Sequence, residues 1–315
     1  MTREEATALQ LPFPIHKGLI TNLDQIESLW SHLLHLDLRI DPAEHPILLT
    51  EPALPPPPLR AKSAELLFER FHAPALYLSS QATLSMYASG KIYPSVVVDI
   101  GEEVSSVVPL YNEHVLEGGV VQLEVSGGDL TEFLMGVLNA QGYVFGSSWE
   151  RLLAREMKES LGCVALDHAE ALRGAPAQDY CLPDGQVVRV GGEGLHCAEA
   201  LFQPSLVGRS CFGVHEGIHE AINRCDVDIR RELYGKIILV GGSTLFKGFS
   251  DRLSKELFAL APCGMRLHIC AAPERRYSSW IGGSILGSLS TFQSMFITQE
   301  EYDEIGPVIV NRRCY

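Results

Sequence analysis

Three short turns of this sequence carry glycines where backbone amides could meet phosphate oxygens. Asp99-Ile-Gly-Glu-Glu103 joins two apolar runs, and Gly127 with Asp129 opens an apolar helical pattern. Gly241-Gly242-Ser243-Thr244 directly follows the apolar run Lys236–Val240. Glycine lets a backbone approach a ligand closely, and amides at turns and helix starts attract anions. The residues alone leave a plainer interpretation open for each turn: a surface hairpin, a helix start and a tight connection.

Alternating strands and helices must position these turns. Residues 94–100 form a continuous apolar run, which is typical of a strand covered on both faces, and residues 104–110 return from it as a hairpin. The alternation predicts an α/β class with mixed sheets. Strands are expected at 45–50, 74–78, 94–100, 104–110, 120–125 and 236–240, and helices after residue 22 and at 64–71, 81–88, 127–138, 149–161 and 248–260.

Two segments carry no helical or strand pattern. Residues 1–12 suggest a weakly held leader. Pro55-Pro-Pro-Pro58 predicts a stiff, extended surface loop, because consecutive prolines favour the polyproline conformation. A ligand for a proline-recognition domain is a second interpretation of the same run.

Composition and charge exclude several classes. The 39 acidic against 25 basic residues give a net charge of -14, which argues against direct nucleic-acid binding. The apolar runs are strand-sized and the start lacks an apolar signal core, so no membrane association is expected. Eight scattered cysteines without a CxxC pair indicate a reduced compartment and no zinc. His32 and His35 are interpreted as a solvated helix face.

An ordered series of short peptides resembles actin and actin-related proteins, from about Leu11 to Tyr315. Each peptide is short, but their common order makes the set specific, and the many substitutions favour a divergent, actin-related member. The matching peptides are Phe13-Pro-Ile, Gly18-Leu-Ile-Thr-Asn22, Glu44-His-Pro-Ile-Leu-Leu-Thr-Glu51, Tyr87-Ala-Ser-Gly90, Asp129-Leu-Thr131, Val164-Ala-Leu-Asp167, Leu182-Pro-Asp-Gly-Gln-Val187, Glu199-Ala-Leu-Phe-Gln-Pro-Ser205, Cys225-Asp-Val-Asp-Ile-Arg230, Pro273-Glu-Arg275, Trp280-Ile-Gly-Gly-Ser-Ile-Leu286, Ser288-Leu-Ser-Thr-Phe-Gln293 and Glu301-Tyr-Asp-Glu304.

The resemblance implies a ribonuclease H-like, actin-like α/β ATPase fold: two lobes with mixed sheets and a nucleotide between them. Residues 11–89 and 277–315 are expected to form the first lobe. Residues 90–125 and 210–276 would form the core of the second lobe, and 126–209 its outer subdomain. The first lobe is expected to be incomplete, because the family's opening hairpin, with its first phosphate loop, and the small subdomain after it have no counterpart here.

The same resemblance assigns the hydrolytic residues. Gln81 matches the glutamine that orients the attacking water. Asp99 matches the carboxylate that holds hydrated magnesium through water, and Gly101 matches a phosphate-cradling glycine. ATP or ADP with Mg²⁺ is therefore the implied cofactor.

Several substitutions in this region depart from the family pattern. Glu102 and Glu103 replace an aspartate and a glycine, and Glu103 is expected to crowd the turn and repel phosphates. Ser106 and Lys17 stand where the family has histidines. Weak or absent hydrolysis is expected, and whether the chain is an enzyme stays open.

The adenosine side matches more fully. Arg155, Lys158 and Glu159 share one expected helix, where a solvated charged face is the alternative interpretation. Phe246 and Arg276 replace the family's tyrosine and lysine beside the adenine. The resemblance assigns nucleotide contacts to Gly101, Gly127, Asp129, Arg155, Lys158, Glu159, Gly241, Gly242, Ser243, Phe246 and Arg276.

Two surfaces bear on assembly. The family's partner groove is matched near Tyr87, Ile285, Leu286 and Leu289, which would receive actin-family subunits or actin-binding proteins. Arg209 brings a charge into the loop that matches the family's inter-strand plug, so impaired self-polymerisation is expected.

Three hypotheses follow from this pattern. The first is an actin-like cytoskeletal protein of the cytoplasm that binds adenine nucleotide. The second is a non-catalytic, actin-related scaffold subunit of a larger complex, for which a nuclear complex is also open. The third is a fragment without an independent fold, because an unpaired sheet edge in the first lobe favours aggregation.

Overall fold

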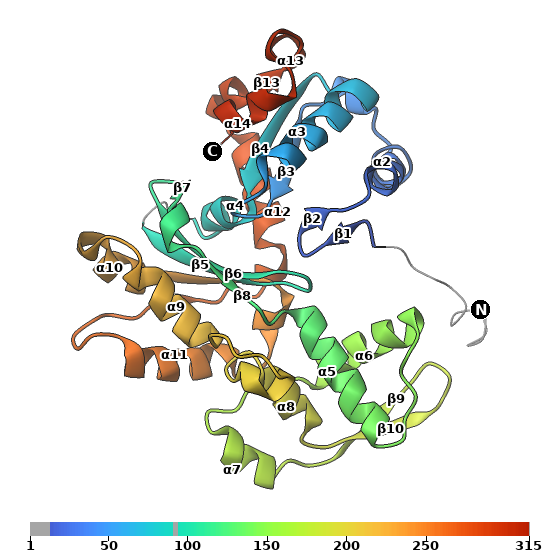
Figure 1. Cartoon of the computed structure of the whole chain (residues 1–315), viewed down its shortest axis with the longest axis vertical. Helices are drawn as coiled ribbons and strands as arrows, with labels where there is room; N and C mark the ends of the chain where they lie inside the picture. Colours follow the sequence, from blue (N-terminus) through green and yellow to red (C-terminus); the bar gives the residue numbers. More distant parts are fainter. Residues whose placement is uncertain (1–12, 91–93, 315) are drawn as a thin grey trace.

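The computed structural model describes residues 13–90 and 94–314, arranged as two units of α/β structure (Figure 1). The leader expected at residues 1–12 lies outside the described residues. One unit surrounds a three-stranded sheet and the other a six-stranded sheet. The predicted α/β class with mixed sheets is confirmed, since each sheet has both parallel and antiparallel neighbours.

The first unit combines the two ends of the chain. In its sheet the central strand β4 (Ala75–Ser80) pairs in parallel with β3 (Ile47–Glu51) and antiparallel with β13 (Ile297–Thr298). A small hairpin, β1 (Ile15–His16) and β2 (Leu19–Ile20), lies beside it. Its helical segments are α2 (Leu23–Ser31), η1 (His32–Asp37), η2 (Pro42–Glu44), α3 (Pro57–Glu65), η3 (Leu66–Arg70), α4 (Gln81–Ala88), α12 (Ser278–Ser288), η8 (Ser290–Met295), α13 (Gln299–Ile305), η9 (Pro307–Ile309) and α14 (Val310–Arg313).

The second unit is built on the order β12-β11-β5-β6-β7, with β8 also paired to β6. The β5–β6 hairpin is antiparallel, whereas β11 is parallel to β5. These strands are β5 (Ser95–Ile100), β6 (Ser105–Tyr111), β7 (His114–Val115), β8 (Val121–Leu123), β11 (Ile237–Val240) and β12 (Ile269–Cys270).

Helices pack against this sheet, and a separate hairpin, β9–β10, lies away from it near α5 and α6 (Figure 1). Five of the helical segments come from residues 126–209, together with the hairpin β9–β10. The segments of the unit are η4 (Glu117–Gly119), α5 (Gly127–Ala140), α6 (Ser148–Leu161), α7 (His168–Arg173), β9 (Gln178–Cys181), β10 (Val187–Val190), α8 (Glu193–Glu199), η5 (Pro204–Val207), α9 (Val214–Asn223), α10 (Val227–Tyr234), η6 (Gly242–Leu245), α11 (Phe249–Leu260) and η7 (Arg275–Tyr277).

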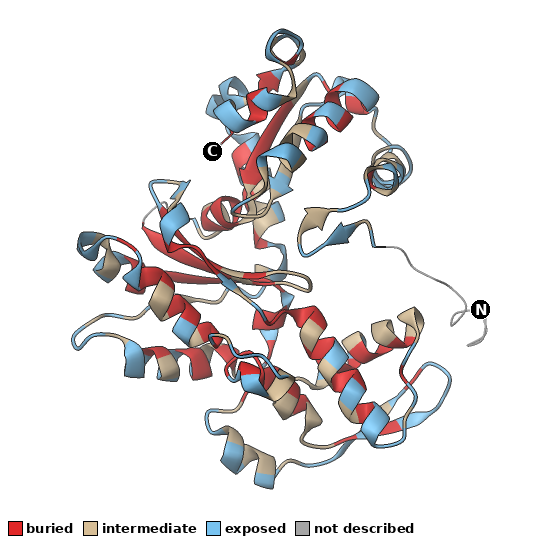
Figure 2. Ribbon diagram, viewed as in Figure 1, coloured by how far each residue is buried: buried red, intermediate tan, exposed pale blue. Residues whose placement is uncertain are grey.

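Strand β5 is buried on both faces, as its apolar run predicts. Val96 and Val98 join the core that includes helix α9, whereas Val97 joins a second cluster with Ala82 and Met86 of α4. Successive side chains of a strand point to opposite faces, so a strand covered on both sides must be apolar throughout. Helix α4 therefore fastens the first unit to the sheet of the second (Figure 2).

The prediction for the proline run is wrong in part. Helix α3 starts at Pro57, and only the prolines before it are extended. Proline suits the first turn of a helix because its fixed φ matches and its missing N–H would be unpaired there anyway. Elsewhere the local signals are confirmed: Asn22 caps α2 by accepting from the Gln25 N–H.

Candidate functional site

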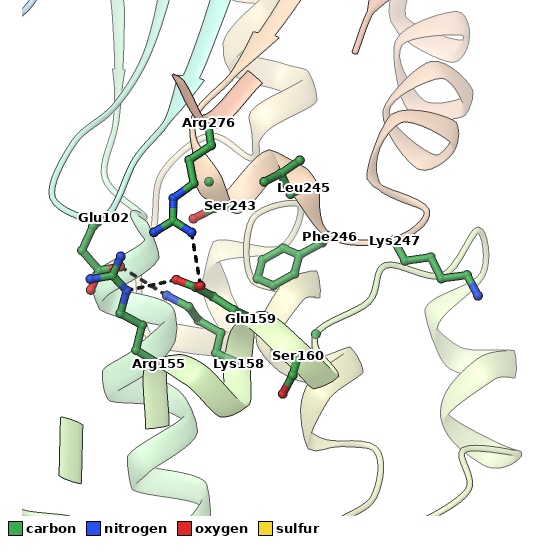
Figure 3. Close-up of a pocket in the computed structure, with 12 residues that line it drawn as sticks. Glu102, Arg155, Lys158, Glu159, Ser160, Ser243, Leu245, Phe246, Lys247 and Arg276 are labelled. Carbon is green, nitrogen blue, oxygen red and sulfur yellow. Dashed lines mark hydrogen bonds and ion pairs between the residues drawn. The ribbon is translucent and has the colours of Figure 1, made fainter. Parts of the chain in front are cut away.

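A cavity of about 390 Å³ lies where α6, η6 and η7 meet (Figure 3). Four separate parts of the sequence supply its lining: Glu102, residues 155–162, residues 242–247 and Arg276. Seven residues that the sequence assigns to a nucleotide line it: Arg155, Lys158, Glu159, Gly242, Ser243, Phe246 and Arg276.

Lys158 is almost fully buried at the floor of this cavity, with 3% of its surface exposed. Its ammonium donates to the Gly127 carbonyl at 2.6 Å and to the Thr131 hydroxyl at 2.9 Å. Its third partner is the Glu102 carboxylate at 3.3 Å. Burial lowers the pKa of Lys158, and the nearby Glu102 charge partly opposes that shift. Lys158 thus ties α6 to α5 and to the β5–β6 turn, and it is not a solvated surface charge.

The other charged residues are more accessible. Glu159 pairs with Arg155 at 3.0 Å and with Arg276 at 3.5 Å, and all three side chains stay partly exposed. Exposed ion pairs contribute little to stability, so a ligand can rearrange them at low cost. These side chains can therefore meet a polar or anionic ligand at the mouth of the cavity.

The aromatic wall depends on a missing side chain. Phe246 is buried against Gly162, where a Cβ atom would overlap the Phe246 ring. Gly242, by contrast, faces open space within the lining, because a Cβ atom there would meet nothing within 4 Å. The cavity thus has one tightly fixed apolar wall and one open glycine wall.

The β5–β6 turn meets the start of α5 through backbone hydrogen bonds. The Gly127 N–H donates to the Gly101 carbonyl at 2.8 Å, and the Gly128 N–H donates to the Glu102 carbonyl at 2.7 Å. Gly101 and Gly127 are therefore neighbours, but the first amides of α5 are already bonded within the protein. Those two amides face the turn, so a ligand would have to displace it to reach them.

Asp129 lies apart from the main cavity. Its carboxylate accepts from the Ser126 N–H at 2.9 Å and the Ser126 hydroxyl at 2.7 Å, which caps α5. It also faces Arg209 at 3.6 Å. The structure places Asp129 in a neighbouring hollow with Glu103, Arg151 and Arg209.

A family model described as Actin matches residues 2–315 of this chain. The chain belongs to the actin family. The resemblance seen in the sequence is confirmed, and the two α/β units correspond to an actin-like two-lobed fold.

Gln81 and Asp99 of this actin-family chain share a narrower hollow of about 50 Å³, with Ser106 and Gln122. Gly241, with φ of +87°, lies against Asp99: a Cβ atom there would be 2.6 Å from its carboxylate Oδ1. Within the described residues, no basic side chain pairs with Asp99. The set of one carboxylate, two amides and a hydroxyl fits hydrated Mg²⁺, which keeps most of its waters.

Burial raises the pKa of Asp99 to about 6, above its ordinary value of 3.8. The folded chain therefore holds this proton more tightly than the unfolded chain. The contribution of Asp99 to the free energy of unfolding is then largest at low pH and declines as pH rises from about 4 to about 6.

Replacing Asp99 with asparagine is expected to remove that decline. The variant should exceed the parent's free energy of unfolding by about 1–3 kcal/mol near pH 7.5, and by about a third of that near pH 4.5, without added metal. Urea denaturation at both pH values measures the difference, with exposed Asp303→Asn as the control. A gain that is equal at both pH values would contradict the assigned role of the carboxyl.

The matched partner groove is only partly open. Ile285 and Leu289 are 40% and 43% exposed, but Leu286 is buried in the first core. The Tyr87 hydroxyl donates to Glu113 at 2.5 Å. The groove stays a prediction whose accessible part is smaller than the sequence suggested.

Five lining residues were also missed by sequence reasoning: Glu102, Ser160, Gly162, Leu245 and Lys247. Glu102 had been noted only as a departure from the family pattern. Glu103, the side chain expected to repel phosphates, instead accepts from the Lys17 N–H at 3.2 Å and does not line the main cavity. Local pattern gave no signal for which of the two glutamates points inward.

Two structural features are absent from the described residues. These residues contain no helix long and apolar enough to cross a membrane. They also contain no cluster of three or more histidine, cysteine or acidic residues that could hold a metal ion.

Proposed function

We propose that this actin-family chain binds an adenine nucleotide, ATP or ADP with Mg²⁺, in the cavity between α6, η6 and η7. The observation that carries the proposal is the convergence of seven residues assigned to a nucleotide on one cavity of about 390 Å³. A mixed lining of aromatic, glycine and charged groups is what ligand sites commonly show.

The proposal assigns a neighbouring residue to each part of the nucleotide. Phe246 supplies the apolar wall for the base, and Glu159 supplies a carboxylate for the ribose hydroxyls. Arg276 is exposed enough to reach a polar edge or a phosphate. Mg²⁺, when bound, would neutralise phosphate charge, with Asp99 holding its waters and Gln81 beside the attacking water.

We further propose that hydrolysis is weak or absent. The first amides of α5 are bonded to the turn carbonyls, and the Glu102 carboxylate lies beside Lys158. Hydrolysis needs donors aimed at the charge that develops on the phosphates. Donors that already have protein partners stabilise that charge less.

The test is nucleotide binding to a variant in which the cavity is filled. Gly242→Leu should weaken ADP and ATP binding by about tenfold or more, because its side chain enters open space in the lining. Gly136→Leu is the matched control, since a Cβ there also meets nothing within 4 Å but lies outside the cavity. Isothermal titration measures affinity, and phosphate release measures turnover.

Unchanged affinity in Gly242→Leu would locate the nucleotide elsewhere. Turnover comparable to that of a complete actin would overturn the proposal of weak hydrolysis.

A scaffold role in a larger complex is the second candidate. It is favoured by the same bonded amides and by Arg209, whose contact with Asp129 at 3.6 Å ties the plug-like loop back to α5. Because this ion pair is exposed and contributes little to stability, the support for impaired self-polymerisation is the charge that Arg209 brings to the loop. Either candidate would use partners at Tyr87, Ile285 and Leu289, in a cytoplasmic cytoskeletal structure or a nuclear complex.

We also propose residue boundaries for the two lobes. Residues 11–89 with 277–315 form the first lobe, 90–125 with 210–276 the core of the second, and 126–209 its outer subdomain. The separate apolar cores support this division, since one of them draws only on residues 20–87 and 286–314.

A further inference from the structure

The Glu102 carboxylate occupies an unusual position for a turn residue. It lies 3.3 Å from the buried Lys158 ammonium and 3.8 Å from the Arg151 guanidinium. It also lines the main cavity together with Arg155 (Figure 3). One anion from the protein itself is therefore surrounded by three cations at the inner end of the cavity.

The glycines at the start of α5 make room for this arrangement. A Cβ atom on Gly127 would lie 3.0 Å from Glu102 Oε2, and one on Gly128 would lie 3.1 Å from Arg151 Nη2. The carboxylate thus lies over the first turn of a 14-residue helix, where the positive end of the helix dipole favours an anion.

We propose that Glu102 is an internal substitute for a phosphate and sets the ligand specificity of the cavity. This inference rests on the proposed function. With the anion position filled by the protein, a nucleotide gains little from its phosphates, and the cavity selects chiefly for the nucleoside part. A phosphate that approaches Lys158 must displace the carboxylate or accept repulsion from it.

Neutralising this carboxylate should therefore create a phosphate site. Glutamine keeps an oxygen that can accept from Lys158, so Glu102→Gln removes the charge and retains the hydrogen bond. Lys158 and Arg155 would then line the cavity without the Glu102 charge, and Arg151, in the neighbouring hollow, would lose the same anion at 3.8 Å. An added phosphate supplies the missing charge.

The experiment compares three ligands by isothermal titration: adenosine, ADP and inorganic pyrophosphate. The parent should bind adenosine and ADP within about threefold of each other. Glu102→Gln should tighten ADP and pyrophosphate by about tenfold or more and leave adenosine unchanged. Glu132→Gln is the control, because it removes a charge that pairs with the same Arg151 at 2.8 Å but does not line the main cavity.

The outcomes separate this inference from the proposed function. The inference is overturned if Glu102→Gln binds ADP and pyrophosphate with affinities within about threefold of the parent's. If no protein binds adenosine or ADP but Glu102→Gln gains pyrophosphate binding, the proposed function fails and the anion position stands.

A second variant covers the case in which Glu102→Gln does not fold. In Glu102→Asp the side chain is shorter by one methylene group, so the same negative charge lies farther from Lys158. It should tighten pyrophosphate by about threefold, and no tightening would overturn the inference.

Discussion

Replacing Gly282 with alanine is expected to lower the free energy of unfolding by about 3 kcal/mol or more. Gly282 lies on α12 where that helix crosses α4. A Cβ atom there would overlap the Leu84 carbonyl oxygen and lie 2.5 Å from its carbonyl carbon. Backbone atoms cannot rotate aside as a side chain can, so the two helices must separate.

Separating α4 from α12 would disturb the packing of both lobes. Leu84 belongs to the core of the first lobe, and Met86 of the same helix packs on the sheet of the second. Chemical denaturation measures the loss of stability. The control is Gly287→Ala, on the same helix, where the added methyl group meets nothing within 4 Å.

The control should be neutral or slightly stabilising, because alanine favours helix over glycine by about 1 kcal/mol. If Gly282→Ala and Gly287→Ala change stability alike, the close crossing of α4 and α12 is not present in solution.

Replacing Arg252 with methionine is expected to cost about 3–5 kcal/mol of stability. The Arg252 guanidinium binds both carboxylate oxygens of Glu199, at 3.1 and 2.9 Å, and donates to the Ala165 carbonyl at 2.8 Å. Glu199 is 1% exposed, so the substitution leaves a buried carboxylate whose remaining side-chain hydrogen bond, among residues 13–90 and 94–314, is the one from Gln203 at 2.9 Å. An uncompensated buried charge is far more costly than a lost surface ion pair.

The matched control lies one turn along the same helix. Lys255→Met removes an exposed cation whose bond is to the Leu166 carbonyl at 2.7 Å, and it should change stability by about 0.5 kcal/mol or less. The double variant Arg252→Met with Glu199→Leu should recover most of the loss, because it removes the stranded charge. A single Arg252→Met variant as stable as the parent would show that solvent reaches Glu199.

Gly282 and Arg252 lie on the two helices that directly follow segments lining the candidate cavity. Helix α12 follows η7, which carries Arg276, and α11 follows η6, which carries Gly242 and Ser243. Arg252 fixes α11 to α8 through its ion pair with Glu199, and α11 directly follows the segment that carries the glycine wall. Loss of either contact is therefore expected to loosen the cavity as well as the fold.

The local elements were predictable from sequence because their signals are local. Asn22 before an apolar helical pattern marks a helix start, and the structure shows it with its capping hydrogen bond. The apolar run of β5 predicted a strand covered on both faces, and it is one. The proline run failed because the same residues suit both an extended segment and a first helical turn.

The sequence by itself determined the family, the α/β class and seven of the residues that line the main cavity, because ordered peptides and periodic patterns can be recognised from sequence order alone. Gly101, Gly127, Asp129 and Gly241, which it also assigned to the nucleotide, lie outside that lining. Only the tertiary structure decided that the amides of Gly127 and Gly128 are bonded to the turn, that Lys158 is buried, and that Glu102 turns inward while Glu103 turns to Lys17. The direction of a side chain is set by segments packed against it, and Glu102 lies 56 residues from its partner Lys158. That information is absent from any local pattern.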